Sequence, residues 1–405
     1  MADPKVALYP ASPVAIIIIL GMLSAFAPLA TDLYLPGLHL LGTTFRVGEN
    51  ETQATLSVFF LGLALGQAIY GPLSDHFGRR MPLLFGIVVF IAGTAGCLST
   101  DDFTIFLASR FIQAIGGSAG MVIGRAVVND LFTGQENVKA QTLLMVVMVI
   151  TPIIAPTLGG LILSVASWRV IFLAILIIGF LCGLLTMLFL PETLKIGERG
   201  HSKVSDAFAA YGRLLSNRMF LIPALVGALA QGSMFAFISG SSFVLIQWFG
   251  VSQAHFGYLF GAVAIGMVIA AQINNLAVAR WSIGSLLGAG LVFNLLMGLI
   301  LVFVSGTKSL IDFMVPLWLT IASIGFIGSN VTVIAMEESK SDSGSGSAVI
   351  GVLQFGLAFV ASSLVSVTQN GTARPMAMVI FLCSLLAGAA WLIRLNIKRQ
   401  AAVSG

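Results

Sequence analysis

The sequence predicts an all-α integral membrane protein with 12 transmembrane helices arranged as two six-helix bundles. First, 58% of the 405 residues are hydrophobic and only 9% are charged, whereas soluble domains carry about 25% charged residues. Second, apolar runs of roughly 20 residues, the length that crosses a bilayer, recur along the chain. Third, one long polar interval, residues 191–218, separates six runs from six. Inside a bilayer only helices satisfy their backbone hydrogen bonds so locally, so the bundles are expected to be helical.

The first half, residues 1–190, is expected to form the N-terminal six-helix bundle. Its helices are predicted at about 14–38, 51–74, 82–99, 104–128, 138–165 and 168–190. Ala25-Phe26-Ala27 has the residue types of a signal-peptidase site. Pro28 would follow the cut, and the apolar run continues beyond it, so the first helix is expected to remain uncleaved.

The polar interval and the second half follow the same pattern. Residues 191–218 are rich in charge and are expected to form a cytoplasmic linker, with an amphipathic turn near 204–215. Residues 219–405 are expected to form the C-terminal six-helix bundle. Its helices are predicted at about 219–248, 254–279, 284–305, 310–336, 343–367 and 374–395.

The lysines and arginines predict the orientation. Fifteen of the 20 fall in loops and ends on the side of the N-terminus, four fall on the other side, and only Arg110 is placed inside a helix. Positive residues concentrate on the cytoplasmic side of membrane proteins, so both termini are expected to be cytoplasmic. The same distribution argues against a nucleic-acid partner, although the net charge is +4.

Several classes of function are disfavoured by what the sequence lacks. The three cysteines fall in apolar segments without metal or disulfide spacing, so no metal site is expected. The sequence has no phosphate-binding G-x-x-x-x-G-K-[ST] run, so ATP-driven pumping by this chain is not expected. No Ser-His-Asp arrangement or histidine cluster suggests an enzyme, and no ring of charge suggests a pore.

A charged turn, Gly71 to Arg80, lies between two apolar runs. Cytoplasmic positive charge explains the arginines of this turn but neither its acid nor the spacing of its glycines. The pattern G-x-x-x-D-x-x-G-R-R resembles the loop between helices 2 and 3 of major facilitator superfamily transporters. The resemblance implies a cytoplasmic latch that holds when the carrier opens outward. Its expected members are Gly71, Asp75, Gly78, Arg79, Arg80, Arg125 and Asp130.

Four further motifs support this resemblance. Residues 107–117, LASRFIQAIGG, are similar to the helix 4 signature of the superfamily, and residues 155–160, APTLGG, to the helix 5 signature of its antiporters. Pro191-Glu192-Thr193 matches the usual end of helix 6. Residues 31–36, TDLYLP, resemble the first helix of the Bcr/CflA drug-resistance family.

The resemblance implies a major facilitator fold and proton-coupled efflux of small lipophilic drugs or metabolites across a bacterial inner membrane. The expected coupling ion is the proton, without any cofactor, and the expected partners are a small-molecule substrate and the lipid bilayer, with the protein acting as a monomer. An alternative is a transporter of the same fold dedicated to one physiological solute, such as a nucleoside or sugar derivative. A membrane receptor or scaffold without transport is a further alternative.

Asp32 and Arg110 are the candidate groups for proton coupling. Asp32 is the only acid well inside an apolar run, and a charged Asp at the bilayer centre costs roughly 2.5–3.5 kcal/mol. Asp32 could instead lie at a helix end near the outer surface and hydrogen-bond a local backbone group beside Pro36. Arg110 could serve only to tie helix 4 to backbone carbonyls of helix 1. Several multidrug relatives carry a second acid where this chain has Ser24, so neutral or zwitterionic substrates are expected.

The remaining candidate residues lie inside predicted spans. A bent, closely packed helix 5 is expected to act as a pivot, because proline removes a helical hydrogen bond and glycine allows close approach. The pivot residues are Pro152, Pro156, Gly159 and Gly160. Aromatic, methionine and polar side chains within spans suit a lipophilic substrate. The candidate substrate contacts are Tyr34, Gln113, Met121, Gln231, Phe235, Phe237, Asn330 and Gln354.

Overall fold

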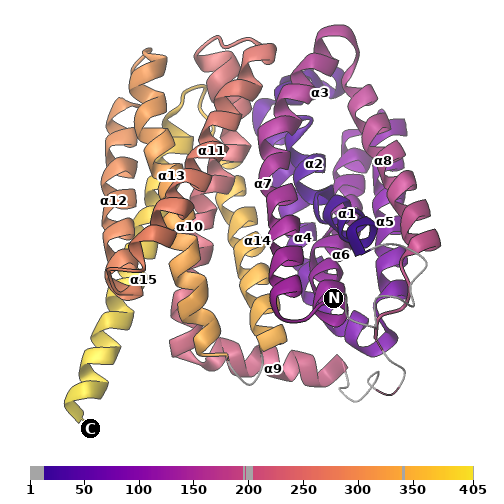
Figure 1. Cartoon of the computed structure of the whole chain (residues 1–405). Helices are drawn as coiled ribbons and strands as arrows, with labels where there is room; N and C mark the ends of the chain where they lie inside the picture. Colours follow the sequence, from indigo (N-terminus) through magenta and orange to yellow (C-terminus); the bar gives the residue numbers. More distant parts are fainter. Residues whose placement is uncertain (1–12, 195–196, 198–203, 340–342, 405) are drawn as a thin grey trace.

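Helices α1 to α8 gather into one bundle, and α10 to α15 form a second bundle beside it (Figure 1). The computed structural model describes residues 13–194, 197, 204–339 and 343–404, and every regular element in these ranges is helical. Helix α9 lies across one end of the two bundles (Figure 1). We call this the linker end, and we call the other the opposite end.

The first bundle begins with a broken helix and continues with five long ones. The broken helix comprises α1 Pro13–Ser24, α2 Phe26–Asp32, the 3-10 turn η2 Leu35–Gly37 and α3 Leu38–Phe45. The long helices are α4 Glu49–Phe77, α5 Arg80–Ser99, α6 Phe103–Leu131, α7 Gly134–Val165 and α8 Trp168–Phe189.

The second half begins with the short helix α9, Val204–Ser216, where an amphipathic turn was predicted. The six helices of the second bundle are α10 Arg218–Ser242 with the π-helical extension η4 Phe243–Trp248, α11 Gln253–Ala277, α12 Ile283–Val304, α13 Leu310–Glu337, α14 Ser343–Val367 and α15 Arg374–Ser404. Eleven helices of the described chain are long and apolar enough to cross a membrane, and the bent pair 14–24 with 26–45 would be the twelfth.

The first helix differs from the single span predicted at 14–38. Its two parts are bent by 41° around Ala25, and the helical course runs on to Phe45. Proline has no N–H to pair with the carbonyl four residues earlier. Pro28 therefore leaves the carbonyl of residue 24 unpaired and Pro36 leaves that of residue 32 unpaired, and α1 ends at Ser24 and α2 at Asp32.

The second half contains a charged pair that the sequence did not predict. Arg394 was counted among the cytoplasmic cations, at the end of the helix predicted at 374–395, but it lies well within α15 and only 2% of its side chain is exposed. Its Nη2 donates to Oε1 of Glu338 at 3.2 Å, and its guanidinium lies 5.5 Å from the ring centre of Trp391. Arg110 is therefore not the only arginine enclosed within a span.

Hydrogen bonds join the two bundles near the opposite end. Across α4 and α14, Ser57 Oγ lies 2.9 Å from Ser362 Oγ, and Ser366 Oγ donates to a carbonyl of α4 at 2.5 Å. His39 Nε2 lies 3.1 Å from Gln253 Nε2. Helices α7 and α11 also approach closely, since a Cβ on Gly257 would lie only 2.4 Å from the backbone of α7. The bundles are thus closed against each other at the opposite end.

Candidate functional site

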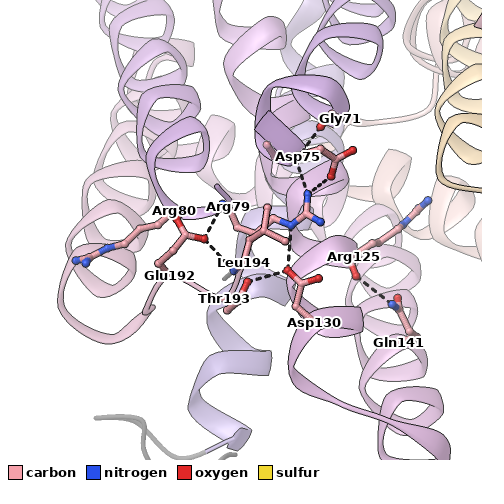
Figure 2. A network of polar contacts seen from close by, with 11 residues as sticks. Gly71, Asp75, Arg79, Arg80, Arg125, Asp130, Gln141, Glu192, Thr193 and Leu194 are labelled. Atoms are coloured by element: carbon pink, nitrogen blue, oxygen red, sulfur yellow. Dashed lines mark hydrogen bonds and ion pairs between the residues drawn. The ribbon is translucent and has the colours of Figure 1, made fainter. Parts of the chain in front are cut away.

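The predicted latch residues form a charged network at the linker end (Figure 2). Arg79 lies in the turn between α4 and α5, after Gly78, whose φ of 92° favours glycine. The Arg79 guanidinium pairs with Asp75 through Nη1 and with Oδ2 of Asp130, at the end of α6, through Nε at 2.9 Å. The structure therefore brings Asp75, Arg79 and Asp130 together, as the sequence predicted.

The two ion pairs differ in their exposure to solvent. The side chain of Arg79 is 11% exposed and that of Asp130 18%, whereas Asp75 is 54% exposed. Burial lowers the pKa of the Arg79 guanidinium, but hydrogen bonds and charges from Asp130 and Asp75 outweigh burial and raise that pKa above its usual value. Solvent screens an exposed pair strongly, so Asp130 is the stronger partner of Arg79.

The end of the sixth span completes this network. One carboxylate oxygen of Glu192 accepts from the backbone N–H of Arg79 at 2.8 Å, and the other accepts from that of Arg80 at 3.2 Å. These N–H groups open α5, where a carboxylate satisfies unpaired donors and the positive end of the helix dipole. Thr193 Oγ donates to Asp130 Oδ2 at 2.9 Å. Sequence reasoning matched these residues only to a helix end, because the contact spans 113 residues.

The other predicted latch residues lie around the charged core. Gly71 O accepts from Ser74 Oγ, which itself accepts from Arg79 Nη1, both at 2.9 Å. Arg80 Nη2 donates to the carbonyl of Met187 at 2.6 Å. Arg125 contributes its carbonyl to the side chain of Gln141, while its guanidinium points away from the carboxylates (Figure 2). Arg125 is therefore outside the ionic network in this conformation.

Arg110 is fully enclosed in the interior of the first bundle. Its Nη1 donates to the carbonyl of Ala30 at 3.1 Å and to Oε1 of Gln113 at 2.5 Å. The guanidinium carbon lies 4.2 Å from the ring centre of Phe59 and 4.6 Å from that of Tyr34. Aromatic faces stabilise a cation that has left water. Nε and Nη2 have no partner within the described chain.

The neighbours of Arg110 extend the network to other helices. Gln113 Nε2 donates to Thr94 Oγ on α5 at 2.8 Å, and the Tyr34 hydroxyl lies 2.9 Å from Thr55 Oγ on α4. Gln113 thus uses both ends of its amide within the bundle. Gln113 and Tyr34 remain predictions as substrate contacts, and in this conformation they hold Arg110.

Asp32 is the last residue of α2 and is 2% exposed. The only hydrogen bond to its carboxyl group within the described chain comes from Thr31 Oγ, at 2.9 Å to Oδ1. It forms no ion pair there, although the carbonyl of Ala30, two residues earlier, accepts from Arg110. Asp32 therefore lies at a helix end and is enclosed, and the hydrogen bond to its carboxyl group comes from a side chain and not from the backbone. Its part in proton coupling stays a prediction.

Some predicted substrate residues are engaged within the second bundle. Asn330 on α13 and Asn274 on α11 pair through their side-chain amides, at 2.7 and 3.3 Å. The ring of Phe237 stacks on Phe260 with centres 5.1 Å apart. Met121, in the first bundle, is buried. Asn274 was not singled out from the sequence, because nothing in the local pattern shows which helix a buried amide faces.

Other predicted substrate residues meet at the seam between the bundles. The Phe235 ring on α10 lies 4.7 Å from that of Phe60 on α4 and 5.6 Å from that of Phe355 on α14. Gln231 lies one turn before Phe235 on the same face of α10. Gln354 lies beside Phe355, half-buried. The seam therefore combines three aromatic rings with amide groups.

The predicted pivot helix, α7, contacts both the first span and the other bundle. Both of its prolines lie inside the helix. A Cβ on Gly159 would lie 1.9 Å from the carbonyl oxygen of Leu33, and one on Gly160 would lie 2.5 Å from that of Gln253 on α11. Glycine is required at both crossings, because any side chain would separate the backbones.

Comparison with known proteins agrees with this architecture. A family model described as Major Facilitator Superfamily matches residues 20–363. The chain belongs to this superfamily.

Relatives of this superfamily member include transporters and resistance proteins. The chain is 33% identical over 384 residues to an uncharacterised MFS-type transporter, YdgK, of Bacillus subtilis (strain 168), covering 93% of this chain and 94% of the relative. It is 28% identical over 377 residues to a bicyclomycin resistance protein homologue of Haemophilus influenzae, with 91% and 93% covered. It is 30% identical over 310 residues to a chloramphenicol resistance protein of Pseudomonas aeruginosa, with 75% and 72% covered. The predicted resemblance to drug-resistance members is confirmed.

Solved structures share the fold of this superfamily member. The crystal structure of a D-xylose-proton symporter matches with a TM-score of 0.73 at 15% identity, covering 92% of this chain and 97% of the symporter chain. Identity this low supports the fold alone.

In this superfamily member, Gly159→Ala is expected to lower both stability and transport. The new Cβ would clash with a backbone oxygen that has no flexible side chain to move, and overpacking of this kind costs about 1–3 kcal/mol. The apparent melting temperature in detergent and the rate of substrate flux measure the effect. Gly328→Ala is the matched control, because a Cβ added at this helical glycine would have no other side chain or helix within 4 Å. Equal melting temperatures for the two variants would contradict the close crossing.

Proposed function

We propose that the protein is a proton-coupled antiporter that exports small neutral or zwitterionic lipophilic compounds from a bacterial cell by alternating access. The observation that carries this proposal is Asp32, an enclosed carboxyl group at a break in the first helix without a cationic partner in the described chain. Such a group carries its charge only at considerable cost unless a proton, a cation or water reaches it. A carboxyl group whose access to water changes between conformations can therefore load and release a proton.

The arrangement of the bundles supports alternating access. The hydrogen bonds between α4 and α14 and between His39 and Gln253 close the opposite end. The positive-inside distribution supports a cytoplasmic linker end, with both termini on that side. The conformation described would then be closed toward the outside. Movement of one bundle against the other around a central site is the expected transport step.

The linker-end network supports the second half of this cycle. Its ion pairs and the Glu192 carboxylate hold α4, α5, α6 and the end of α8 together. A rigid end of the first bundle can move as one body when the cytoplasmic side closes. We therefore retain a role in conformation and not in substrate binding for Asp75, Arg79 and Asp130. Their ion pairs are formed within the first bundle although the opposite end is closed, so they would act by keeping that bundle rigid throughout the cycle.

The energy for export would come from the proton gradient. The membrane potential supplies about 2.3 kcal/mol per charge per 100 mV. No cofactor is required for such a cycle, and a monomer suffices because both bundles belong to one chain. The resistance proteins among the relatives support drugs or similar compounds as cargo.

Transport into everted membrane vesicles, with a panel of compounds and with or without a pH gradient, tests the proposal. Uptake of several unrelated neutral compounds that depends on the gradient is expected. If only one sugar or nucleoside derivative is transported, and its flux is the same with and without the gradient, the alternative of a dedicated transporter of the same fold is favoured. Absence of flux for every compound would exclude both.

A further inference from the structure

Three glutamines from both bundles lie within about two helical turns of one another along the central seam, near the rings of Phe235 and Phe355. On α4 and α14, a Cβ on Gly351 would lie 2.7 Å from Oε1 of Gln67. Gln67 is therefore at the level of Gly351, and Gln354 is one turn further along α14. The Ser57–Ser362 hydrogen bond confirms that these helices run in opposite directions in this register.

The packing of α10 on α14 places the third glutamine, Gln231, about one turn beyond Gln354 toward the opposite end. A Cβ on Gly232 would lie 3.8 Å from Ala361 and 4.0 Å from the carbonyl oxygen of Leu357. Side chains on a helix tilt toward its N-terminus. The N-termini of α10 and α14 are at the linker end and that of α4 is at the opposite end. The side chains of Gln231 and Gln354 therefore tilt toward the linker end, and that of Gln67 tilts the other way, toward them.

These amide groups are not used inside the protein. The Oε1 atom of Gln231 is buried without a hydrogen-bond partner in the described chain. Gln67, itself buried, and Gln354, half-buried, form no hydrogen bond to any described residue. A buried polar group without a partner costs about 1–3 kcal/mol. The Oε1 atom of Gln231 is therefore costly unless something else binds it. The amides of Gln67 and Gln354 are likewise available to a ligand.

Other enclosed amides of the chain show the contrast. Asn330 pairs with Asn274, and Gln113 pairs with Arg110 and Thr94. Gln53 also lacks a partner, but it is fully enclosed near the closed opposite end. The three seam glutamines are instead contributed by both bundles, where a transported molecule has to pass.

We propose that Gln67, Gln231 and Gln354 bind the polar groups of an uncharged substrate whose ring rests on Phe235 and Phe355. An amide both donates and accepts hydrogen bonds and carries no charge. The site therefore suits neutral aromatic compounds with hydroxyl, carbonyl or amide groups. A cation without hydrogen-bond donors would gain only the ring contacts. This assignment rests on the proposed export function and specifies its cargo.

The test compares two probes on the purified full chain: chloramphenicol, which is neutral and carries an aromatic ring, an amide and hydroxyl groups, and tetraphenylphosphonium, a cation without donors. Calorimetric binding of chloramphenicol is expected to weaken about tenfold in Gln67→Leu, Gln231→Leu and Gln354→Leu, the loss of one hydrogen bond. Binding of tetraphenylphosphonium is expected to change less than about twofold. Gln272→Leu, on an exposed part of α11, is the control and should leave both unchanged.

A variant that binds one probe more tightly than the wild type cannot be explained by misfolding. Gln231→Glu places a negative charge at the site and is expected to strengthen binding of tetraphenylphosphonium. The three leucine variants could instead bind chloramphenicol with wild-type affinity and still exchange it in proteoliposomes. That result would overturn the site but not the export function. Wild-type protein that exchanges no compound of a neutral panel would overturn the export function and this assignment with it.

Discussion

Asp32→Asn is expected to abolish uphill efflux driven by a pH gradient and to leave exchange of substrate without a gradient intact. Asparagine has almost the same shape as aspartate and can still accept the hydrogen bond from Thr31 Oγ. It cannot bind or release a proton, so the coupling step is lost while the substrate path remains. Efflux in everted vesicles should fall to the level of vesicles that lack the protein.

The control for this variant is Asp312→Asn, at an exposed position in the first turn of α13. It should transport at the wild-type rate with and without a gradient. Retained exchange in Asp32→Asn would show that the variant is folded. Wild-type rates of gradient-driven efflux in Asp32→Asn would exclude this carboxyl group from coupling and with it the main support for an antiporter.

Arg79→Ala is expected to lower both the stability of the folded protein and its transport rate. It removes both ion pairs and leaves Asp130, only 18% exposed, without its charged partner. Removal of one partner of a fully buried pair costs about 3–5 kcal/mol. Since solvent reaches this pair in part, we expect about 2 kcal/mol here. The apparent melting temperature in detergent should fall by several degrees, and transport should slow because the latch is lost.

A double-mutant cycle with Asp130→Ala measures the coupling between these two side chains. The double variant should lose less stability than the sum of the single variants, because neither charge is then left unpaired. Arg280→Ala, in the corresponding loop between α11 and α12, is the control and should have little effect. Additive losses in the cycle would show that Arg79 and Asp130 act independently, against the network in Figure 2.

The first helix shows how far sequence reasoning reached in predicting the fold. Its position was predicted from apolar length alone, because a span must cross the hydrocarbon. Its breaks at Ser24 and Asp32 were not predicted, although each lies four residues before a proline. A proline can be accommodated by a kink or by a break, and the sequence does not distinguish the two. In the structure the helix breaks at Asp32, and the next residue, Leu33, packs against Gly159 of α7.

Some charged groups of the site were also predicted from the sequence, and others were missed. Asp75, Arg79 and Asp130 were predicted together from a motif, and the structure places them in one network. Glu192 was missed as a member because its contact joins residues 113 positions apart. Arg394 was counted with the cytoplasmic cations because it lies at the end of the helix predicted at 374–395, yet α15 extends to Ser404 and the Arg394 side chain is buried beside Glu338.

The sequence by itself determined the class of protein and the succession of its spans, because hydrophobic length and charge distribution are properties of a segment alone. The structure decided which enclosed polar groups have partners. Gln113 and Asn330 were predicted as substrate contacts together with Gln231 and Gln354, and nothing in the linear pattern separates the two pairs. The first pair forms hydrogen bonds within one bundle, and the second faces the seam. Whether a buried amide is satisfied depends on the neighbouring helix, and only the tertiary fold brings that helix to it.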